Sequence, residues 1–392
     1  MNVLSLFDGM SCGQQALERL GIKVDNYFAS EIDKYAIKVT MANYPNTIQL
    51  GSVVGVDGYK LPKIDLLIGG SPCQSFSFAG KRKGMATKCE TEILTLKHYL
   101  QLKSEGYEFE GQSYLFWEFM RLLNECKPKY FLLENVEMGE KWEKVLNKAI
   151  GVNGIHINSA LVSAQNRKRI YWTNIGLIPG GLFGDLESII KQPKDKNILL
   201  KEVLESEVDE KYFLSEKALN FILDETRLKK KYTQNGSEAE KSLPHLAKNQ
   251  TNWCGDFIVH NTMPRSGDSK KGGTGHLSRN DGKTYCLDTG NTNAVELRKV
   301  RQLSINNKSN GATQPYQQDR VYDIEGISPA LSTDSRPLMI NTSRIRRLTP
   351  LECERLQTVA DNYTNHVSDS QRYKMLGNGW TVDVIAYIFS FL

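Results

Sequence analysis

Residues 65–74, with the sequence Asp-Leu-Leu-Ile-Gly-Gly-Ser-Pro-Cys-Gln, constrain the fold more than any other stretch of the chain. The apolar run 66–68 predicts a short buried strand, which two glycines end. Pro72 forces an extended backbone at the residue before it and stiffens the turn. Cys73 therefore follows a rigid strand-to-loop turn, within reach of a substrate or cofactor. These residues alone leave open a nucleophilic and a structural cysteine.

Short apolar runs alternate with helical segments along the first 175 residues. The predicted strands are 3–7, 27–30, 47–53, 65–68, 130–136, 157–162 and 170–175, and the predicted helices are 14–20, 33–41, 90–102 and 115–126. This alternation is typical of a parallel α/β sheet with right-handed crossovers. Ligands of such sheets bind beyond the carboxyl ends of the strands. We therefore expect the turn 7–13, Glu31, Cys73 and Glu134 to lie along one edge of the sheet.

The amino-acid composition and the pattern of apolar residues change after Pro179. Helical pieces at 199–204 and 215–228 are followed by many Gly, Asn, Ser and Thr residues with short apolar islands. We expect a second, smaller domain there. The last residues are helical again, and we expect the helix 383–392 to return to the first domain.

Charge divides the chain unevenly. Residues 226–347 carry 20 Lys and Arg against 11 Asp and Glu, a net charge of +9 within a chain of net charge +5. A basic module beside a mildly acidic one suggests a polyanionic partner, although a solvated basic surface explains the charge equally well.

Other bulk features exclude several classes of protein. No run approaches the ~18 apolar residues of a membrane span, and the first residues lack a basic segment with a cleavage site. None of the seven cysteines forms a Cys-x-x-Cys pair, so we expect neither a disulfide framework nor a zinc site. A reducing cytoplasm fits this cysteine pattern.

The turn 8–13 lacks the Gly-x-Gly-x-x-Gly spacing that cradles a pyrophosphate, which disfavours NAD and ATP. Glu31 follows the second predicted strand, where an acidic residue suits ribose hydroxyls. An adenosine cofactor without a pyrophosphate and an ordinary strand–helix turn both stay open from these residues.

Together with these features, a series of short motifs resembles the DNA (cytosine-5) methyltransferases in the order of that family. The matching segments are Phe7-Asp-Gly9, Ser30-Glu31, Gly70-Ser-Pro-Cys-Gln74, Glu134-Asn-Val136, Gln165-x-Arg167-x-Arg169, 347–357 and Gly377-Asn378. They cover residues 1–175 and 345–392. The first motif is closest to the de novo branch of vertebrate enzymes and to phage or bacterial relatives.

The resemblance implies a Rossmann-like S-adenosylmethionine-dependent methyltransferase domain, residues 1–178 and 345–392, with a smaller target-recognition domain, residues 179–344. It implies S-adenosyl-L-methionine as the cofactor and no metal. The residues expected to hold this cofactor are Phe7, Asp8, Gly9, Met10, Ser11, Glu31, Ile32, Ser52, Val53, Pro72, Leu115, Asn378 and Gly379. Ser52 stands where the family usually has an adenine-contacting Asp, and Trp380 where a small aliphatic residue is common.

The chemistry that the resemblance implies assigns four catalytic residues. Cys73 would add to C6 of cytosine, which turns C5 into a nucleophile toward a sulfonium methyl group. Glu134, protonated or sharing a proton, would contact N3 and the exocyclic amine. Arg169 with Arg167 would hold the base edge or a nearby phosphate and help orient Glu134. Taken singly, Glu134 is better explained as a paired strand-end carboxylate and the two arginines as a basic surface pair. Their combination in one series of motifs favours catalysis.

DNA contacts are expected in two places. A stacked base is out of reach inside a duplex, so the target has to be flipped out, and the loop 75–84 is placed to close over it. The expected contacts in and beside this loop are Gln74, Ser75, Lys81 and Arg82. The segments 282–289 and 326–333 share the pattern Gly-x4-Leu-x-Thr, so we expect sequence readout at Thr289 and Thr333, with Arg298, Lys299 and Arg301 on phosphates.

Other functions stay open at this point. One alternative is an RNA cytosine-5 methyltransferase of the same fold, and another is a catalytically inactive DNA-binding relative. A thiol hydrolase is disfavoured because no His follows a predicted strand near Cys73. We expect a monomer that acts on double-stranded DNA in the cytoplasm of a bacterial or phage-infected cell, with or without a cognate restriction endonuclease and without membrane attachment.

Overall fold

The computed structural model describes residues 1–72, 85–87, 91–109, 111–180, 185–213, 257–261, 277–279, 284, 293–297 and 344–392. Its strands are β1 Asn2–Leu6, β2 Asn26–Ser30, β3 Ile48–Gln49, β4 Leu66–Gly70, β5 Tyr130–Val136, β6 Ile155–Asn158, β7 Lys168–Thr173, β8 Leu177–Gly180, β9 Asp185–Ser188, β10 Phe257–Asn261, β11 Leu277–Arg279, β12 Asn293–Leu297 and β13 Arg344–Arg347. Its α-helices are α1 Cys12–Arg19, α2 Lys34–Asn43, α3 Leu96–Ser104, α4 Phe116–Cys126, α5 Glu140–Ile150, α10 Pro350–Leu356, α11 Asp369–Asn378 and α12 Val382–Phe389.

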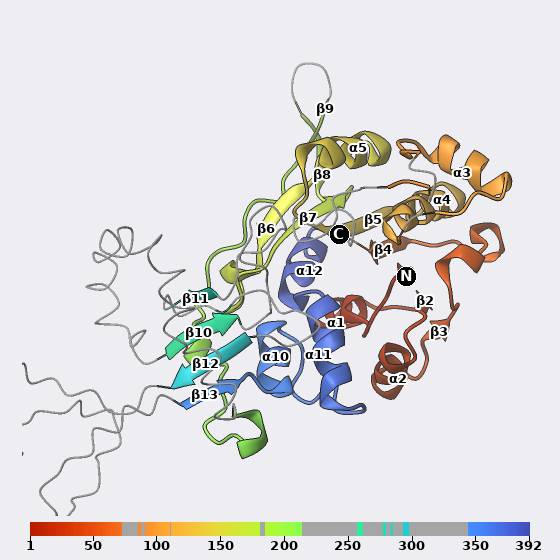
Figure 1. The fold of residues 1–392 in the computed structure, drawn as a ribbon. Helices are drawn as coiled ribbons and strands as arrows, with labels where there is room; N and C mark the ends of the chain where they lie inside the picture. The colour runs from red at the N-terminus through yellow and green to blue at the C-terminus, as the bar shows by residue number, and fades with distance from the viewer. Residues whose placement is uncertain are drawn as a thin grey trace, which may run out of the picture.

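A seven-stranded sheet in the order β3-β2-β1-β4-β5-β7-β6 forms the centre of the molecule (Figure 1). The strands from β3 to β5 are parallel, whereas β7 runs antiparallel to both β5 and β6. Glu134 on β5 lies opposite Gly70 on β4 and opposite Tyr171 on β7. The predicted α/β class is confirmed, and the carboxyl ends of β1, β2, β4 and β5 meet at one edge of the sheet.

Helices cover both faces of this sheet, which explains why its central strands are apolar on both sides. On β4, Leu66 and Ile68 pack into a core with α1 and α12, and Leu67 packs into a second core with α4 and α5. All three leucine and isoleucine side chains are fully buried. The alternation of the strand thus anchors β4 from both faces, and β4 ends three residues before Cys73 in the sequence.

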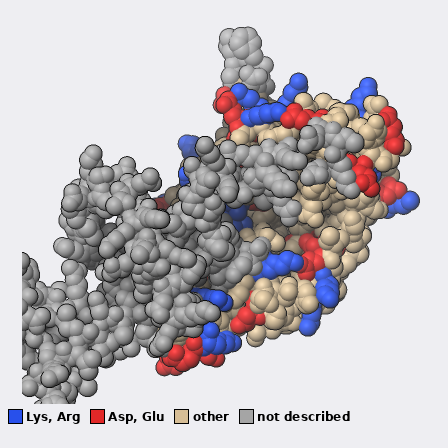
Figure 2. Space-filling view, in the orientation of Figure 1, with Lys and Arg blue, Asp and Glu red and all other residues tan. Residues whose placement is uncertain are grey.

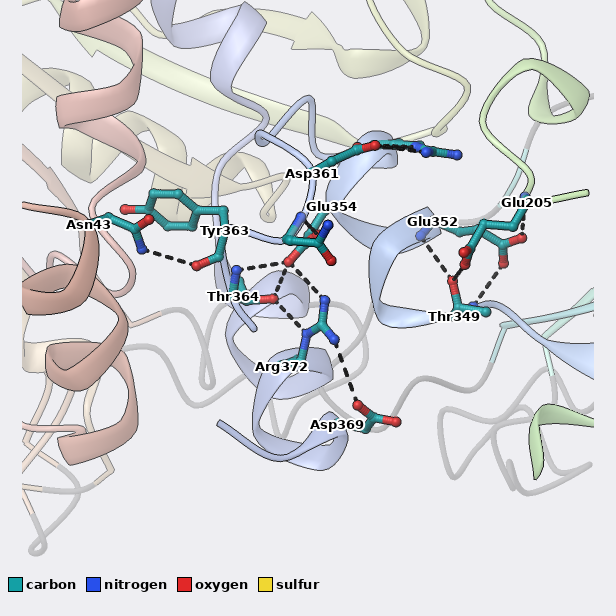
Figure 3. A network of polar contacts seen from close by, with 12 residues as sticks. Asn43, Glu205, Thr349, Glu352, Glu354, Asp361, Tyr363, Thr364, Asp369 and Arg372 are labelled. Carbon is teal, nitrogen blue, oxygen red and sulfur yellow. Dashed lines mark hydrogen bonds and ion pairs between the residues drawn. The ribbon is translucent and has the colours of Figure 1, made fainter. Parts of the chain in front are cut away.

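The C-terminal helices return to the start of the chain, as predicted. Helix α12 packs against α1, and Arg19 on α1 forms an ion pair with Asp383 on α12. Figure 3 shows the polar contacts of the buried carboxylates on α10, which connect this helix to α11 and to the segment between the two helices. Glu354 on α10 accepts hydrogen bonds from the backbone N–H groups of Asn362 and Thr364 and from Arg372 on α11. Because a buried carboxylate needs such partners, this network fixes α10 against α11.

Two predicted helices differ from the structure. The segment predicted as a helix from residue 90 becomes helical only at Leu96, after Thr95, whose hydroxyl accepts from the His98 N–H. Before that cap, Ile93 donates its backbone N–H to the Met85 carbonyl, so residues 91–93 extend along 85–87 instead. The predicted helix at 199–204 is a single 3₁₀ turn, Leu200–Glu202. The predicted helix at 215–228 lies outside the described residues.

Residues near both expected domain boundaries contact the central fold. Ile190, Leu200 and Val203 are buried in the core beside α12, although they follow the expected boundary at 178. At the other boundary, β13 closes a four-stranded antiparallel sheet in the order β11-β10-β12-β13, which lies beside α10 (Figure 1). The division into 1–178 with 345–392 and 179–344 stays a prediction. Within the described ranges, no helix has the length and apolarity needed to cross a bilayer.

Candidate active site

The turn after β1 has an unusual backbone that its own side chains stabilise. Phe7, Gly9 and Ser11 have φ angles of 57°, 58° and 61°, in the left-handed region that non-glycine residues rarely adopt. Asp8 holds this conformation. Its Oδ1 accepts from the Tyr27 hydroxyl at 2.9 Å, its Oδ2 accepts from the Ser11 hydroxyl at 2.5 Å, and its backbone N–H reaches β2. The turn is therefore a rigid cradle at the carboxyl end of β1.

Glu31 ties the ends of β1 and β2 together. Its Oε2 accepts from the Gly9 N–H at 2.8 Å, and its Oε1 accepts from the N–H groups of Ile32 and Asp33 at 2.7 and 2.8 Å. A carboxylate offers about four acceptor positions, so these three donors leave one for a ligand. The neighbouring Ile32 side chain is 71% exposed, which is unusual for an isoleucine. A polar acceptor and an apolar surface thus lie side by side.

The other residues expected at the cofactor divide by exposure. Met10 and Val53 are buried in the two cores, whereas Ser52 and Asn378 are exposed. The half-buried residues are Pro72, Leu115 and Gly379. An added Cβ at Gly379 would lie 2.8 Å from the Met10 Cε, so a glycine allows the C-terminal segment to approach the turn after β1. Met10 thus contributes packing beneath the turn.

Glu134 is held at both of its carboxylate oxygens. Its side chain is nearly buried on β5, and Oε1 lies 2.9 Å from Nε of Arg169 in an ion pair. The indole N–H of Trp380 donates to Oε2 at 3.1 Å. The structure therefore brings together two of the predicted catalytic residues. It also adds Trp380, which the sequence marked only as a departure from the family pattern.

Asn135 links β5 to Ser71, the residue directly after β4. Its buried amide donates to the Ser71 hydroxyl at 3.0 Å and to the Ser71 carbonyl at 3.2 Å, and its Oδ1 accepts from the Val136 N–H. The sequence pattern included Asn135 without assigning it a role. Ten of the predicted site residues lie outside the described residues, namely Cys73, Gln74, Ser75, Lys81, Arg82, Thr289, Arg298, Lys299, Arg301 and Thr333.

Arg167 has a different position from the one that the sequence suggested. Its side chain is buried, and its guanidinium donates to the carbonyls of Gly377 at 3.2 Å and Gly379 at 2.8 Å. A guanidinium engaged with two backbone carbonyls connects the arginine segment to the C-terminal segment. The expectation that Arg167 holds the base edge or a phosphate has no support from this position.

Gln357 forms a second buried link that sequence reasoning missed. Its amide donates to the carbonyls of Leu376 at 2.7 Å and Gly379 at 3.2 Å, and its Oε1 accepts from the Thr381 hydroxyl at 2.9 Å. The only signal in the sequence was its place at the end of the segment 347–357. Through these bonds, Gln357 fixes the residues on both sides of Trp380.

The whole chain, residues 1–392, matches the family of C-5 cytosine-specific DNA methylases. The protein belongs to this family. Among similar proteins, the orphan methyltransferase M.SPRI of Bacillus phage SPR is 29% identical, over 99% of this chain and 96% of that protein. The type II methyltransferase M.HgiCI of Herpetosiphon aurantiacus is 27% identical, over 96% of this chain and 93% of that protein. The methylase is therefore a DNA (cytosine-5) methyltransferase, as the sequence motifs predicted.

Solved structures of two methyltransferases share the fold of this methylase. Entamoeba histolytica EhMeth matches with a TM-score of 0.55 at 14% identity, over 100% of this chain and 97% of that one. S. pombe Dnmt2 matches with a TM-score of 0.51 at 17% identity, over 100% and 97% of the two chains. At these identities the likeness concerns the fold alone, and it confirms the predicted Rossmann-like methyltransferase architecture.

Asp8 should make the stability of the methylase depend on pH. Burial raises the pKa of its carboxyl to about 6, with a smaller contribution from the nearby Glu31 charge. The folded state then holds a proton that the unfolded state has lost above pH ~4, so stability falls as pH rises through about 4 to 6. Replacing Asp8 by Asn should remove this fall, which we expect to be about 3 kcal/mol at most because one pKa unit corresponds to about 1.4 kcal/mol.

The measurement is urea unfolding of the wild type and of Asp8→Asn at pH 4, 5, 6 and 7. The difference in unfolding free energy between the two proteins should move in favour of the variant as pH rises. Asp25→Asn, which alters an exposed partner of the N-terminal amine, serves as a control outside the turn. A wild-type-minus-variant difference that is constant from pH 4 to pH 7 would show that Asp8 is not the responsible group.

Proposed function

We propose that the methylase transfers a methyl group from S-adenosyl-L-methionine to C5 of a flipped-out cytosine in double-stranded DNA, through a covalent adduct with Cys73. One observation carries this proposal. Glu134 lies directly opposite Gly70, and Gly70 is three residues before Cys73 in the sequence. Arg169 and Trp380 hold the carboxylate of Glu134. Asn135 fastens the intervening Ser71. A thiol and an oriented carboxylate at adjacent strand ends suit addition to a pyrimidine ring.

The cradle at β1 and β2 fits an adenosine cofactor. Glu31 retains an acceptor position suited to a ribose hydroxyl, and the exposed Ile32 side chain beside it offers an apolar surface suited to adenine. Exposed Ser52 follows β3, the strand that pairs with β2, and its hydroxyl can hydrogen-bond to a polar edge of the adenine. When bound, the cofactor supplies an electrophilic methyl group on a sulfonium sulfur.

The reaction then follows from the roles of three side chains. The Cys73 thiolate forms a bond to C6 of the cytosine, and the displaced electron pair makes C5 nucleophilic. A proton shared between the Glu134 carboxyl group and N3, together with a hydrogen bond from the exocyclic amine to Glu134, stabilises this adduct, while Arg169 keeps the carboxyl group in place. C5 takes the methyl group as the bond from that group to the sulfonium sulfur breaks and the neutral thioether leaves. Solvent accepts the C5 proton, and elimination of the Cys73 thiolate restores the aromatic ring. Arg167 contributes by supporting the backbone behind Trp380.

Recognition of duplex DNA is proposed for the basic part of the chain. Over the described residues in Figure 2, basic and acidic side chains are interspersed, with no large patch of one sign on the face drawn. The basic segment 226–347 lies mostly outside these residues. We assign it the phosphate contacts, and we assign closure over the flipped base to the loop that contains Lys81 and Arg82.

The proposal is tested by methyl transfer from tritiated S-adenosylmethionine to duplex DNA and, in parallel, to tRNA. Label should appear in duplex DNA, and bisulfite sequencing of DNA from expressing cells should reveal one methylated sequence context. Label in tRNA alone would favour an RNA methyltransferase. Absence of label from both substrates, with cofactor binding intact, would favour an inactive DNA-binding relative.

Bacterial and phage origins of the similar proteins support an expectation about the kind of cell in which the enzyme acts. We infer that the enzyme acts as a monomer on DNA in the cytoplasm of a bacterium or a phage-infected cell. Its similarity to both orphan and type II methyltransferases leaves a cognate restriction endonuclease as an open option. Sedimentation of the purified enzyme with a duplex tests the monomer, since a 2:1 complex would contradict it.

Replacing Glu31 by Ala should weaken cofactor binding much more than DNA binding. The variant loses a ribose acceptor and also releases the Gly9, Ile32 and Asp33 amides, so the cradle loosens locally. We expect the cofactor Kd to rise about tenfold or more, which corresponds to ~1.4 kcal/mol. Titration calorimetry with S-adenosylmethionine measures it, with exposed Glu105→Ala as the control. A cofactor Kd within twofold of the wild type would remove Glu31 from the ribose site.

Sequence choice should transfer with residues 180–345. Grafting this segment into a related methyltransferase of known specificity should give an active chimera with the new target site. Within the segment, changes at Thr289 or Thr333 should alter preference at one base pair by about 1–3 kcal/mol. Loss of Arg298 should weaken binding to all sequences and lower the salt slope by roughly one charge. An active chimera that keeps the original site would contradict the assignment.

A further inference from the structure

Trp380 is fixed in the chain by bonds to both of its neighbours. The carbonyl of Gly379 accepts from Arg167 at 2.8 Å and from Gln357 at 3.2 Å. On the other side, the buried Thr381 hydroxyl bonds to Gln357 and lies 2.8 Å from the Ser159 hydroxyl. The backbone that carries the indole is therefore held by buried hydrogen bonds from the arginine segment and from the end of α10. These bonds fix the backbone position of Trp380 and so restrict where its indole can lie.

The indole itself points at the carboxylate of Glu134. Its Nε1 lies 3.1 Å from Oε2, across 246 residues of sequence. Gly70 leaves the space for this contact. A Cβ at that position would lie 2.9 Å from the indole nitrogen and 3.0 Å from Oε2 of Glu134. The end of β4 is therefore shaped around the pair formed by Trp380 and Glu134.

We propose that Trp380 is a positioning residue that holds Glu134 for its contact with the cytosine. This inference rests on the proposed function of Glu134. A carboxylate rotates about the bond to its carboxyl carbon, and a single partner at one oxygen leaves that rotation partly free. Arg169 at Oε1 and Trp380 at Oε2 hold the two oxygens from different directions. Because an indole N–H only donates, Oε2 is kept as an acceptor in this arrangement.

Removal of the indole N–H should slow the chemical step without weakening the binding of DNA or of S-adenosylmethionine. In Trp380→Phe, Glu134 keeps Arg169 but can turn away from the base. We expect the rate at saturating substrates to fall about 10- to 100-fold, since small misplacements of catalytic groups cost up to roughly that much. The KM for DNA and the Kd for S-adenosylmethionine should stay within twofold of the wild type.

A second readout separates positioning of Glu134 from a contact with the cofactor. Without cofactor, addition of the Cys73 thiolate at C6 lets C5 take a solvent proton, and loss of the original C5 hydrogen with the thiolate restores cytosine. Release of tritium from DNA labelled at cytosine C5 measures this exchange. In Trp380→Phe the exchange rate should fall by the same factor as methyl transfer. If Trp380 only contacts the cofactor, this exchange should not change.

Two comparisons keep the test decisive. Replacing the indole of Trp380 by benzothiophene keeps the ring shape but lacks the N–H, so it should reproduce the loss even if Trp380→Phe folds poorly. Trp142→Phe replaces a buried indole on α5 with a phenyl ring, and it should leave the rates of methyl transfer and of C5 exchange unchanged.

The outcomes distinguish this inference from the function on which it rests. Wild-type exchange and methyl transfer with the benzothiophene, while Glu134→Gln is inactive, would overturn the role of Trp380 and leave the proposed function standing. A raised cofactor Kd with unchanged C5 exchange would also overturn it. Full activity of Glu134→Gln would instead contradict the proposed function.

Discussion

Replacing Cys73 with serine should abolish methyl transfer while DNA binding persists. A thiol is a few per cent ionised near neutral pH, whereas a serine hydroxyl stays protonated and adds poorly to C6 of cytosine. The two side chains are nearly equal in size, so the substitution should not disturb the residues packed around position 73. We expect methyl transfer to fall by roughly 10⁴-fold or more, as for other enzymes that lose their nucleophile.

Tritium transfer to duplex DNA measures the loss, and a gel-shift assay with the same duplex measures binding. Cys12 and Cys126 are poor replacements for the Cys73 nucleophile, because burial raises the pKa of Cys12 to about 12 and that of Cys126 to about 11. Cys126→Ser on α4 is therefore the matched control and should retain activity. Turnover of Cys73→Ser within tenfold of the wild type would refute the covalent mechanism.

Replacing Glu134 by Gln should produce the second large loss. Glutamine keeps the shape of the side chain but cannot form the ion pair with the nearly buried guanidinium of Arg169. The variant also lacks the carboxylate that stabilises the adduct at N3. Loss of a general acid–base group typically costs about 10²- to 10⁴-fold, and we expect the rate at saturating substrates to fall within that range.

Single-turnover methyl transfer gives this rate free of product release. Glu140→Gln, an exposed residue at the start of α5, provides a control with the same chemical change. Circular dichroism should show both variants folded, because glutamine and glutamate are nearly equal in size and Glu134 lies near the carboxyl end of β5. A rate for Glu134→Gln equal to that of the control would mean that the carboxylate is not needed.

Much of the fold was predictable from local patterns. The apolar run 66–68, which two glycines and a proline follow, is observed as the buried part of β4. The prediction that Glu31 and Glu134 fall at strand ends along one edge of the sheet is likewise confirmed, since Glu31 directly follows β2 and Glu134 lies near the carboxyl end of β5. These features depend on side-chain alternation and on backbone restrictions within a few residues, which a sequence states directly. Helix 90–102 was predicted less well, because pairing of 91–93 with 85–87 overrides its helical pattern.

The sequence by itself thus determined the α/β class, the family and the strand ends at which the reactive residues lie. Only the tertiary structure decided which side chains meet there. Arg167 and Arg169 look equivalent in the sequence, yet one contacts carbonyls of the C-terminal segment and the other contacts Glu134. Trp380 reaches Glu134 across 246 residues. Periodicity reports the environment of a residue along its own strand or helix, whereas partners so distant are selected by how the sheet and its helices pack.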